Sequence, residues 1–222
     1  MSVLKGKAAV VTGAGRGIGK GHALQLARAG ASVVVNDVDG DVAQEVVGEI
    51  AGFGGTAIAN TDSVAEKACA DAIVSACVEA FGKIDIMMAN AGIVRDRTFL
   101  KMTEDEFDAV INVHVKGTFL CHQAAALSMK EAGTGGVLLS TVSAAHFGNF
   151  GQTNYAGSKG AIASMTYTWA LELARYGIRV NAISPTGTTR MSATYKGPDG
   201  KDVELPFIDP TRNGAFVAYL CS

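Results

Sequence analysis

The chain has 222 residues, of which 27 are glycine and 4 are proline. This length fits one α/β domain, and a chain of this size buries enough surface to fold without disulfides or a metal. With 48% hydrophobic and 18% charged residues, the composition is that of a globular protein and excludes disordered, collagen-like and linker sequences.

Charge and hydropathy exclude two further kinds of partner. The net charge is −2 and Lys and Arg form no block, which argues against a nucleic-acid partner. No apolar run reaches the ~18 residues that a membrane span requires, and the N-terminal residues lack the apolar segment of a signal peptide. The 4 cysteines form no CxxC pair, so we expect free thiols in a cytoplasmic protein.

Short β-branched runs alternate with helical patterns along the whole chain. The predicted strands are nearly all apolar, as strands buried on both faces must be, and cover residues 8–12, 32–36, 56–60, 84–89, 137–142 and 178–183. The predicted helices cover residues 17–29, 42–53, 64–81, 104–129 and 155–176. Just past their ends lie glycines suited to the left-handed conformation, namely Gly30, Gly54, Gly82, Gly133 and Gly177. This order predicts an α/β fold with a doubly wound parallel sheet of the Rossmann type, with residues 1–222 as one dinucleotide-binding domain.

The first predicted strand runs directly into a glycine-rich turn that opens a helix. The turn reads Thr12-Gly13-Ala14-Gly15-Arg16-Gly17-Ile18-Gly19, and Asp37 ends the next strand 18 residues beyond Gly19. A lone glycine pattern is weak evidence, but a strand, a turn, a helix and a following acid together predict a dinucleotide site. The glycines let the backbone approach a pyrophosphate, and the helix N-terminus supplies free N–H groups.

Asp37 indicates which dinucleotide binds. Its carboxylate can accept hydrogen bonds from both adenosine ribose hydroxyls, whereas it would repel a 2′-phosphate. The sequence therefore favours NAD. Arg16 could offset part of that repulsion, which leaves some use of NADP open.

Tyr155 and Lys159 form the second strong signal. Residues four apart on a helix project from one face. A free phenol has a pKa near 10, and we expect the neighbouring ammonium to lower it. Such a tyrosine can protonate a carbonyl oxygen, or deprotonate an alcohol, while hydride moves to or from a nicotinamide.

On these motifs and on Asn90-Ala91-Gly92, the chain resembles the short-chain dehydrogenase/reductase family over nearly its whole length. The resemblance implies that Asn112 supports a proton relay to Lys159, that Asp62 lies near the adenine and that Asn90 stabilises the central strand. It also implies that Lys159 binds the nicotinamide ribose. The cofactor-binding residues implied in this way are Gly13, Arg16, Gly17, Ile18, Gly19, Asp37, Asp62, Ser63, Asn90, Ala91, Gly92, Tyr155, Lys159, Pro185, Gly187 and Thr188.

Residues 35–37, 90–97, 148–155 and 185–191 resemble a particular subgroup more closely. They are similar to the dehydrogenase unit of multifunctional β-oxidation enzymes and to hydroxyacyl-CoA and hydroxysteroid dehydrogenases. The resemblance implies a secondary alcohol or ketone of the acyl-CoA or steroid type as substrate. The alternative is a 3-oxoacyl-thioester reductase, but such enzymes usually take NADPH, which Asp37 disfavours. By the family's habit we expect a homo-oligomer, a tetramer or a dimer, built on the helix that carries Tyr155.

One position departs from the family. Where the family has a serine that holds the substrate oxygen, 13 residues before the tyrosine, this chain has Val142. Ser143 fills the role if the strand ends there in a turn, and the predicted catalytic residues are then Tyr155, Lys159, Asn112 and Ser143. Ser140 or another hydroxyl is an alternative. A chain without this hydroxyl would be a catalytically impaired NAD-binding sensor or partner subunit.

Other segments carry weaker expectations. The family continues through a seventh strand, so we expect this chain to lack the last strand of the fold. Residues 191–207 resemble a substrate lid, and Arg95 and Arg97 either meet the phosphates of a CoA or form a solvated turn. No metal site is predicted, because no histidine has ligand spacing. Packing or surface positions are expected for His22, His114 and His122, and a place beside the substrate pocket for His146, Phe147 and Gln152.

Overall fold

The computed structural model describes residues 2–189, 201, 203 and 206–222. In this part of the chain, six parallel strands form one sheet in the order β3-β2-β1-β4-β5-β6. The strands are β1 (Ala8–Thr12), β2 (Ser32–Asn36), β3 (Thr56–Asn60), β4 (Ile86–Ala89), β5 (Gly136–Thr141) and β6 (Ile178–Ile183). The predicted α/β fold, a single Rossmann-type domain with a doubly wound parallel sheet, is confirmed.

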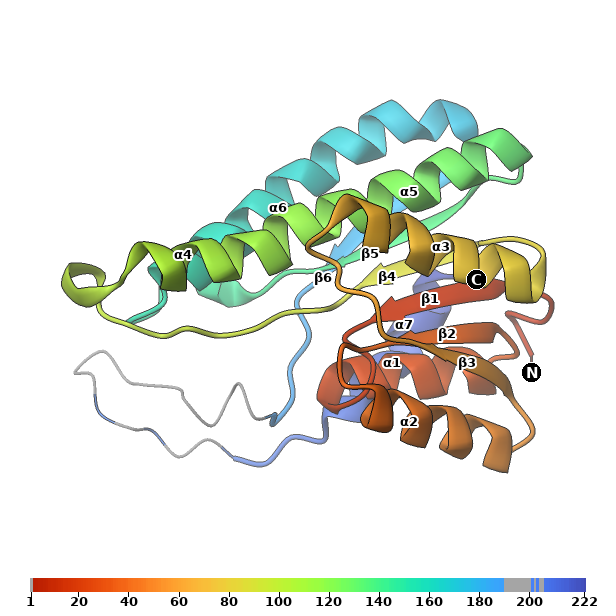
Figure 1. Ribbon diagram of the computed structural model, residues 1–222, viewed down its shortest axis with the longest axis horizontal. Helices are drawn as coiled ribbons and strands as arrows, with labels where there is room; N and C mark the ends of the chain where they lie inside the picture. Colours follow the sequence, from red (N-terminus) through yellow and green to blue (C-terminus); the bar gives the residue numbers. More distant parts are fainter. Residues whose placement is uncertain (1, 190–200, 202, 204–205) are drawn as a thin grey trace.

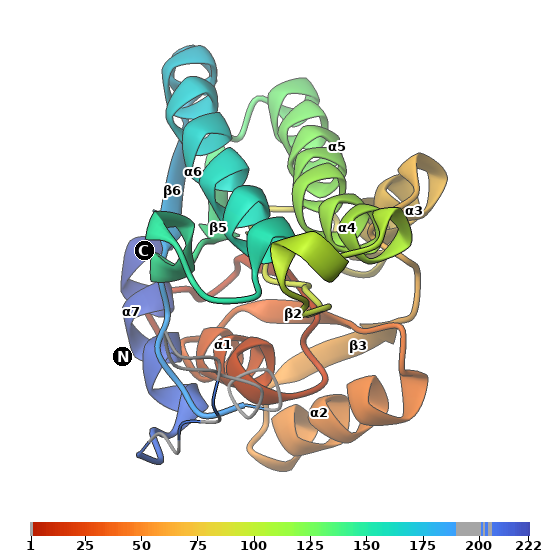
Figure 2. The same ribbon diagram turned by 90° about the vertical axis from the view of Figure 1, so that its left-hand side faces the viewer.

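Two layers of helices cover the sheet, one on each face (Figure 1). The first layer contains α1 (Gly17–Arg28), α2 (Gly40–Gly52) and α7 (Asn213–Leu220). The second contains α3 (Lys67–Phe81), α4 (Glu104–Ile111), α5 (Gly117–Ala132) and α6 (Thr153–Leu173). Because every strand runs in the same direction, the carboxyl ends of all strands meet at one edge, which faces the viewer in Figure 2.

The side chains of each strand alternate between two hydrophobic cores. In β1, Ala9 and Val11 pack into the core beneath α1, α2 and α7, while Ala8 and Val10 pack into the core beneath α3, α5 and α6. A strand with a helical layer on both faces needs apolar residues at every position. This is the physical reason for the continuous apolar runs in the sequence.

Helix α7 lies directly against α1 through small residues. A Cβ atom added to Gly214 would lie 2.6 Å from the carbonyl oxygen of Gly21, and one added to Gly21 would lie 2.6 Å from the Cα of Thr211. The two backbones therefore approach more closely than larger side chains would allow. Among the described residues no strand follows β6, which forms one edge of the sheet.

The predicted helix over residues 104–129 is wrong in one respect. Helix α4 ends at Ile111, and a π-helical turn over Asn112–Lys116 precedes α5, which continues to Ala132. A π turn adds a residue to a helical turn and changes which side chains face the sheet. The other boundaries shift by a few residues, and the five glycines after predicted helices all have positive φ.

Candidate active site

The glycine turn after β1 allows very close backbone packing. Gly13 and Gly17 have φ values of +61° and +55°, a region that glycine adopts readily. A Cβ atom on Gly13 would lie 2.8 Å from the Cα of Ala91, and one on Gly19 would lie 2.1 Å from the carbonyl oxygen of Gly13. These positions leave no room for a side chain, so the turn keeps its backbone close to the segment that follows β4.

Helix α1 begins at the end of this turn with an uncompensated N-terminus. Its N-cap residue Arg16 makes no side-chain cap, and its first turn, which includes Ile18 and Gly19, contains no acidic residue. The free N–H groups and the positive end of the helix dipole fit an anionic group such as a pyrophosphate.

Asp37, directly after β2, lies beside the same turn. Its carboxylate accepts hydrogen bonds from the backbone N–H of Gly15, at 3.0 Å, and of Asp39, at 3.1 Å. The Arg16 guanidinium forms an ion pair with Asp39 at 2.7 Å. Asp37 is therefore held at the turn by backbone groups, and Arg16 is engaged by a different carboxylate.

Asp62 and Ser63 follow β3 at the same edge of the sheet. The Asn36 side-chain amide donates to the Asn60 side-chain oxygen at 2.8 Å and to the Asp62 backbone carbonyl at 2.9 Å. The Asn60 amide donates to the Asp62 carboxylate at 2.7 Å. These bonds fix Asp62 close to the end of β2, while the Ser63 hydroxyl accepts from the Ala65 N–H at 3.3 Å.

Asn90 joins the ends of three strands. Its side-chain amide donates to the carbonyl oxygens of Thr12, at 3.1 Å, and Gly13, at 3.2 Å, and its side-chain oxygen accepts from the Thr141 hydroxyl at 3.4 Å. The Thr12 hydroxyl in turn accepts from the N–H groups of Asn90 and Ala91. Asn90 thus holds the ends of β1, β4 and β5 together.

The loop after β6, with Pro185, Gly187 and Thr188, returns toward the glycine turn. A Cβ atom on Gly187 would lie 2.6 Å from the Cα of Pro210, and the Thr188 N–H donates to the Ile208 carbonyl at 2.7 Å. A Cβ atom on Gly17 would meet the side chain of Thr189 at 3.2 Å. Most of the predicted lid, residues 191–207, falls outside the described residues.

Tyr155 and Lys159 lie on the first turns of α6, as their spacing predicts. The Lys159 ammonium nitrogen is 5.5 Å from the centre of the Tyr155 ring and donates to the carbonyl oxygen of Thr141 at 2.7 Å. The lysine is buried, and burial lowers its pKa to about 7. Lys159 therefore changes charge near neutrality.

The expected lowering of the Tyr155 pKa is wrong for the protein alone. Burial raises the pKa of the Tyr155 phenol, a hydrogen bond with the Ser143 side chain lowers it, and the negative charge of Asp96 raises it. The net shift is upward because burial disfavours the charged phenolate. Burial therefore favours the neutral phenol of Tyr155.

The Ser143 side chain lies close enough to Tyr155 to lower the pKa of the phenol. Strand β5 ends at Thr141, so the strict alternation of a strand no longer governs residue 143, which caps a short 3₁₀ turn. Ser140 faces elsewhere, since its hydroxyl is buried within 2.9 Å of the His122 ring. Ser143 is accordingly the serine that the structure brings to the tyrosine.

No hydrogen bond joins the Asn112 side chain to Tyr155 or Lys159 in the described residues, and the proton-relay role expected of Asn112 stays a prediction. Asn112 is exposed at the start of the π turn, and its backbone carbonyl accepts the Gly117 N–H. His114, two residues later, is fully buried and meets the Tyr155 ring edge-on with centroids 5.4 Å apart. Sequence reasoning missed His114 because residues two apart lie on nearly opposite sides of a helix, and residue type alone selected the asparagine.

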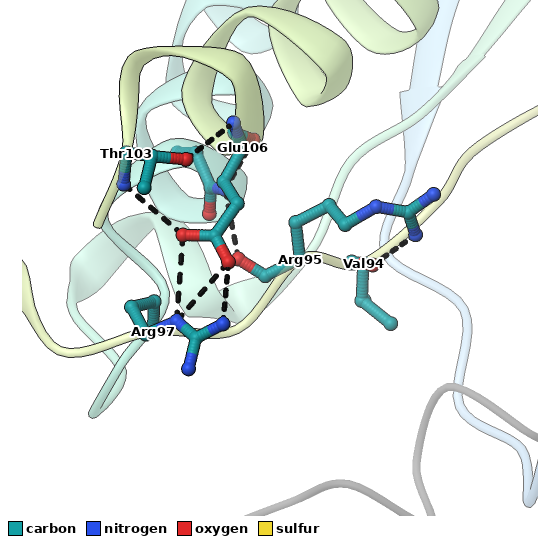
Figure 3. Close-up of polar contacts among 6 residues, drawn as sticks. Val94, Arg95, Arg97, Thr103 and Glu106 are labelled. Atoms are coloured by element: carbon teal, nitrogen blue, oxygen red, sulfur yellow. Dashed lines mark hydrogen bonds and ion pairs between the residues drawn. The ribbon is translucent and has the colours of Figure 1, made fainter. Parts of the chain in front are cut away.

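The two arginines after β4 have different surroundings (Figure 3). The Arg97 guanidinium binds the Glu106 carboxylate through Nε and Nη2, at 3.1 and 2.7 Å to the same oxygen. Glu106 also completes a capping box with Thr103 at the start of α4. The Arg95 guanidinium turns away from this pair and donates to the Val94 carbonyl at 2.9 Å. Both arginines are exposed, but Arg97 is held in an ion pair with Glu106, whereas the Arg95 guanidinium contacts only a backbone carbonyl among the hydrogen bonds of the described residues.

The other histidines lie away from the carboxyl edge of the sheet or contact it only through the backbone. His22 and His122 are buried in the helical layers, while a His146 ring nitrogen contacts the Ser143 carbonyl. Within the described residues, no group of three or more His, Cys, Asp or Glu is arranged to hold a metal ion. In the same part of the chain, we find no helix with the length and hydropathy to span a membrane.

A doubly wound sheet, a glycine turn and a Tyr-Lys pair define a Rossmann-type oxidoreductase, and comparison with known proteins agrees. Residues 7–198 match the family model described as short chain dehydrogenase. The chain is 42% identical over 220 residues to a hydroxyacyl-CoA dehydrogenase of Mycobacterium tuberculosis, covering 93% of this chain and 69% of that protein. It belongs to the short-chain dehydrogenase family and is an oxidoreductase.

Two further comparisons agree with this family and this fold. The chain is 39% identical to the peroxisomal multifunctional enzyme A of Dictyostelium discoideum, covering 98% of this chain but only 50% of that larger protein. A crystal structure of a short-chain type dehydrogenase/reductase from Mycobacterium marinum superposes with a TM-score of 0.90 at 36% identity, covering 100% of this chain and 90% of the other.

Proposed function

We propose that this protein is an NAD-dependent dehydrogenase that interconverts a secondary alcohol and a ketone on a hydroxyacyl-CoA. The observation that carries the proposal is the meeting of Tyr155, Ser143 and Lys159 at the carboxyl edge of the sheet. A neutral phenol, a second hydroxyl and a buried lysine at one place are suited to proton transfer at a carbinol oxygen.

The residues present fit a nicotinamide dinucleotide. The glycine turn and the N-terminus of α1 would hold the pyrophosphate, Asp37 the adenosine ribose, and Asp62 with Ser63 the adenine region. Tyr155 and Lys159 would hold the nicotinamide ribose, beside Ala91, Gly92 and the loop of Pro185, Gly187 and Thr188. The ion pair of Arg16 with Asp39 supports NAD over NADP, because that guanidinium is already engaged by a carboxylate.

The chain's own residues would move the proton and orient the substrate. When bound, the nicotinamide supplies the acceptor or donor of hydride. Ser143 would hold the substrate oxygen, and Tyr155 would take the hydroxyl proton during oxidation or return it during reduction. Lys159, anchored on the Thr141 carbonyl, would favour the phenolate when it is charged.

The substrate class rests on the relatives and on Arg95. The Mycobacterium tuberculosis relative is named a hydroxyacyl-CoA dehydrogenase, and an exposed arginine at the same edge as Tyr155 suits the phosphates of a CoA. A hydroxysteroid is the second choice. A 3-oxoacyl-thioester reductase is disfavoured by Asp37, and a sensor without catalysis is disfavoured by the Ser143 hydroxyl beside Tyr155.

A homo-oligomer, a dimer or a tetramer, is part of the proposal. Helices α5 and α6 expose the apolar side chains of Phe119, Leu127, Tyr167 and Leu171. Exposed apolar groups of this kind commonly mark an interface. The described cysteines are all free thiols, which suits a reducing compartment such as the cytoplasm.

A substrate panel tests the proposed function. Formation of reduced cofactor would be followed with hydroxyacyl-CoAs of several chain lengths and with hydroxysteroids, each with NAD and with NADP. We expect turnover of a hydroxyacyl-CoA with NAD. Binding of NAD in calorimetry without turnover of any alcohol would favour the sensor.

A further inference from the structure

Asp96, in the segment that follows β4, is tied to the loop that leads into α6. The Gln152 side-chain amide donates to both carboxylate oxygens of Asp96, at 3.1 Å each. The Gln152 side-chain oxygen accepts from the Asn149 amide at 2.8 Å, so both ends of the Gln152 amide are used. Gln152 is buried and lies three residues before Tyr155, directly before the first residue of α6. The carboxylate is therefore fixed beside the turn that carries the tyrosine.

Backbone hydrogen bonds brace this carboxylate–amide contact on both sides. The Arg97 N–H donates to the Gly151 carbonyl at 2.8 Å, and the buried Asn154 side-chain amide donates to the Arg95 carbonyl at 3.0 Å. Asp96 is half-buried, whereas Arg95 and Arg97 on either side of it are exposed. The Asp96 side chain thus points toward the start of α6, while its two neighbours lie at the surface.

The negative charge of Asp96 acts on the reacting group of the proposed site. Burial is the largest cause that raises the pKa of the Tyr155 phenol, and the charge of Asp96 raises it further. The Gln152 amide that holds Asp96 is neutral, so this contact leaves the negative charge in place. The adjacent Arg97 guanidinium binds the Glu106 carboxylate at 2.7 Å (Figure 3). A substrate oxygen that meets Tyr155 therefore lies in the field of a nearby carboxylate.

We infer that Asp96 is a specificity-determining residue, which selects a neutral hydroxyacyl thioester over the free hydroxy acid. In a 3-hydroxy acid one methylene separates the carbinol carbon from the carboxylate, so a carbinol bound at Tyr155 brings a second negative charge toward Asp96. In the thioester the same carbon is an uncharged carbonyl, and the repulsion between like charges is absent. The inference rests on the proposed function and narrows its substrate class to activated acyl groups.

The phosphates of a CoA do not meet this repulsion. The pantetheine arm separates them from the carbinol by more than one Debye length, which is roughly 10 Å, so exposed charges at that distance are largely screened. Asp96 therefore discriminates by the charge next to the reacting carbon and not by the charge at the far end of the substrate.

A pair of substrates tests the inference. The kcat/KM with NAD would be measured for a 3-hydroxyacyl N-acetylcysteamine thioester, which carries no phosphate, and for the free 3-hydroxy acid of the same chain length. The ratio of the two values measures the discrimination. Asp96→Asn removes the charge but keeps an oxygen that can accept from Gln152, and we expect the thioester-to-acid ratio to fall about tenfold because the acid improves. Asp105→Asn, which removes an exposed carboxylate at the start of α4, is the matched control and should keep the wild-type ratio.

Two kinetic results would overturn the inference. One is a free acid that is as poor a substrate in Asp96→Asn as in the wild type. The other is a wild-type protein that uses the acid as well as the thioester.

A titration without substrate separates these results from failure of the proposed function. Ionisation of Tyr155 would be followed by ultraviolet absorbance, as the difference between each protein and its Tyr155→Phe form. We expect the pKa of Tyr155 to be lower in Asp96→Asn than in the wild type, because a nearby negative charge has been removed. An unchanged pKa would overturn the inference whether or not the protein turns over a thioester. A lowered pKa in a protein that turns over neither substrate would contradict the proposed function while supporting the electrostatic effect of Asp96.

Discussion

The buried ammonium of Lys159 donates a hydrogen bond to the carbonyl oxygen of Thr141, the last residue of strand β5, at 2.7 Å. Strand β5 also leads directly to Ser143, whose side chain bonds to Tyr155. The end of strand β5 therefore supplies the carbonyl oxygen that holds the Lys159 ammonium, and it also places the Ser143 hydroxyl beside Tyr155.

Lys159 should make stability increase with pH above neutrality. Its pKa in the folded chain is about 7, below its unfolded value near 10.4, so the unfolded chain binds one more proton between these values. The free energy of unfolding then rises by up to about 1.4 kcal/mol per pH unit. Urea unfolding at neutral and alkaline pH should show this rise in the wild type and not in Lys159→Met. Exposed Lys101→Met is the control, and equal slopes in all three proteins would contradict burial of a charge-changing Lys159.

Asp96 should control the pH at which oxidation becomes fast. Its negative charge raises the pKa of Tyr155, so removal of that charge lets the phenolate form at lower pH. In Asp96→Asn, the alkaline rise of kcat/KM for alcohol oxidation is expected to move to lower pH. Asp105→Asn removes an exposed carboxylate at the start of α4 and should leave the profile in place. A shift to higher pH in Asp96→Asn would count against this electrostatic effect.

Ser143 should be required for turnover, and Val142 should not limit it. Loss of one hydrogen-bond donor at a reacting oxygen typically costs about 10²-fold in kcat, so Ser143→Ala is expected to lose about that factor. Val142→Ser, which restores the family's serine position, is expected to gain nothing. Steady-state kinetics of both variants distinguishes the two positions. A large gain in kcat for Val142→Ser would mean that Ser143 does not hold the substrate oxygen.

Asp37 should set the cofactor preference. Asp37→Ser removes the carboxylate that would accept the ribose hydroxyls and repel a 2′-phosphate. The KM for NAD is expected to rise about tenfold, as the loss of a charged hydrogen bond implies, and relative use of NADP should improve. Initial rates with both cofactors check this, and an unchanged NAD-to-NADP ratio would be inconsistent with the assignment.

The architecture could be predicted from the sequence because its signals are local. Apolar runs bounded by glycine specify buried strands, and the turn of Gly13 to Gly19 requires glycine for backbone contacts that no other residue allows. Tyr155 and Lys159 share a helix, so their spacing alone places them together. These features need no knowledge of tertiary packing.

The parts that could not be predicted depend on irregular backbone and burial. The π turn after Ile111 leaves Asn112 exposed and His114 buried, and helical periodicity does not reveal it. The end of β5 at Thr141 frees Ser143 from strand alternation. The raised pKa of Tyr155 results from burial of its phenol. The spacing of Tyr155 and Lys159 in the sequence does not predict how deeply the phenol is buried.

The most direct test compares wild-type protein with Tyr155→Phe for formation of NADH from a hydroxyacyl-CoA at saturating NAD. Removal of a positioned acid–base group typically costs about 10²- to 10⁴-fold in rate. Wild-type turnover with a loss of at least about 10²-fold in Tyr155→Phe is the predicted result. Equal rates in the two proteins would contradict the assignment of Tyr155 as the proton-transfer group.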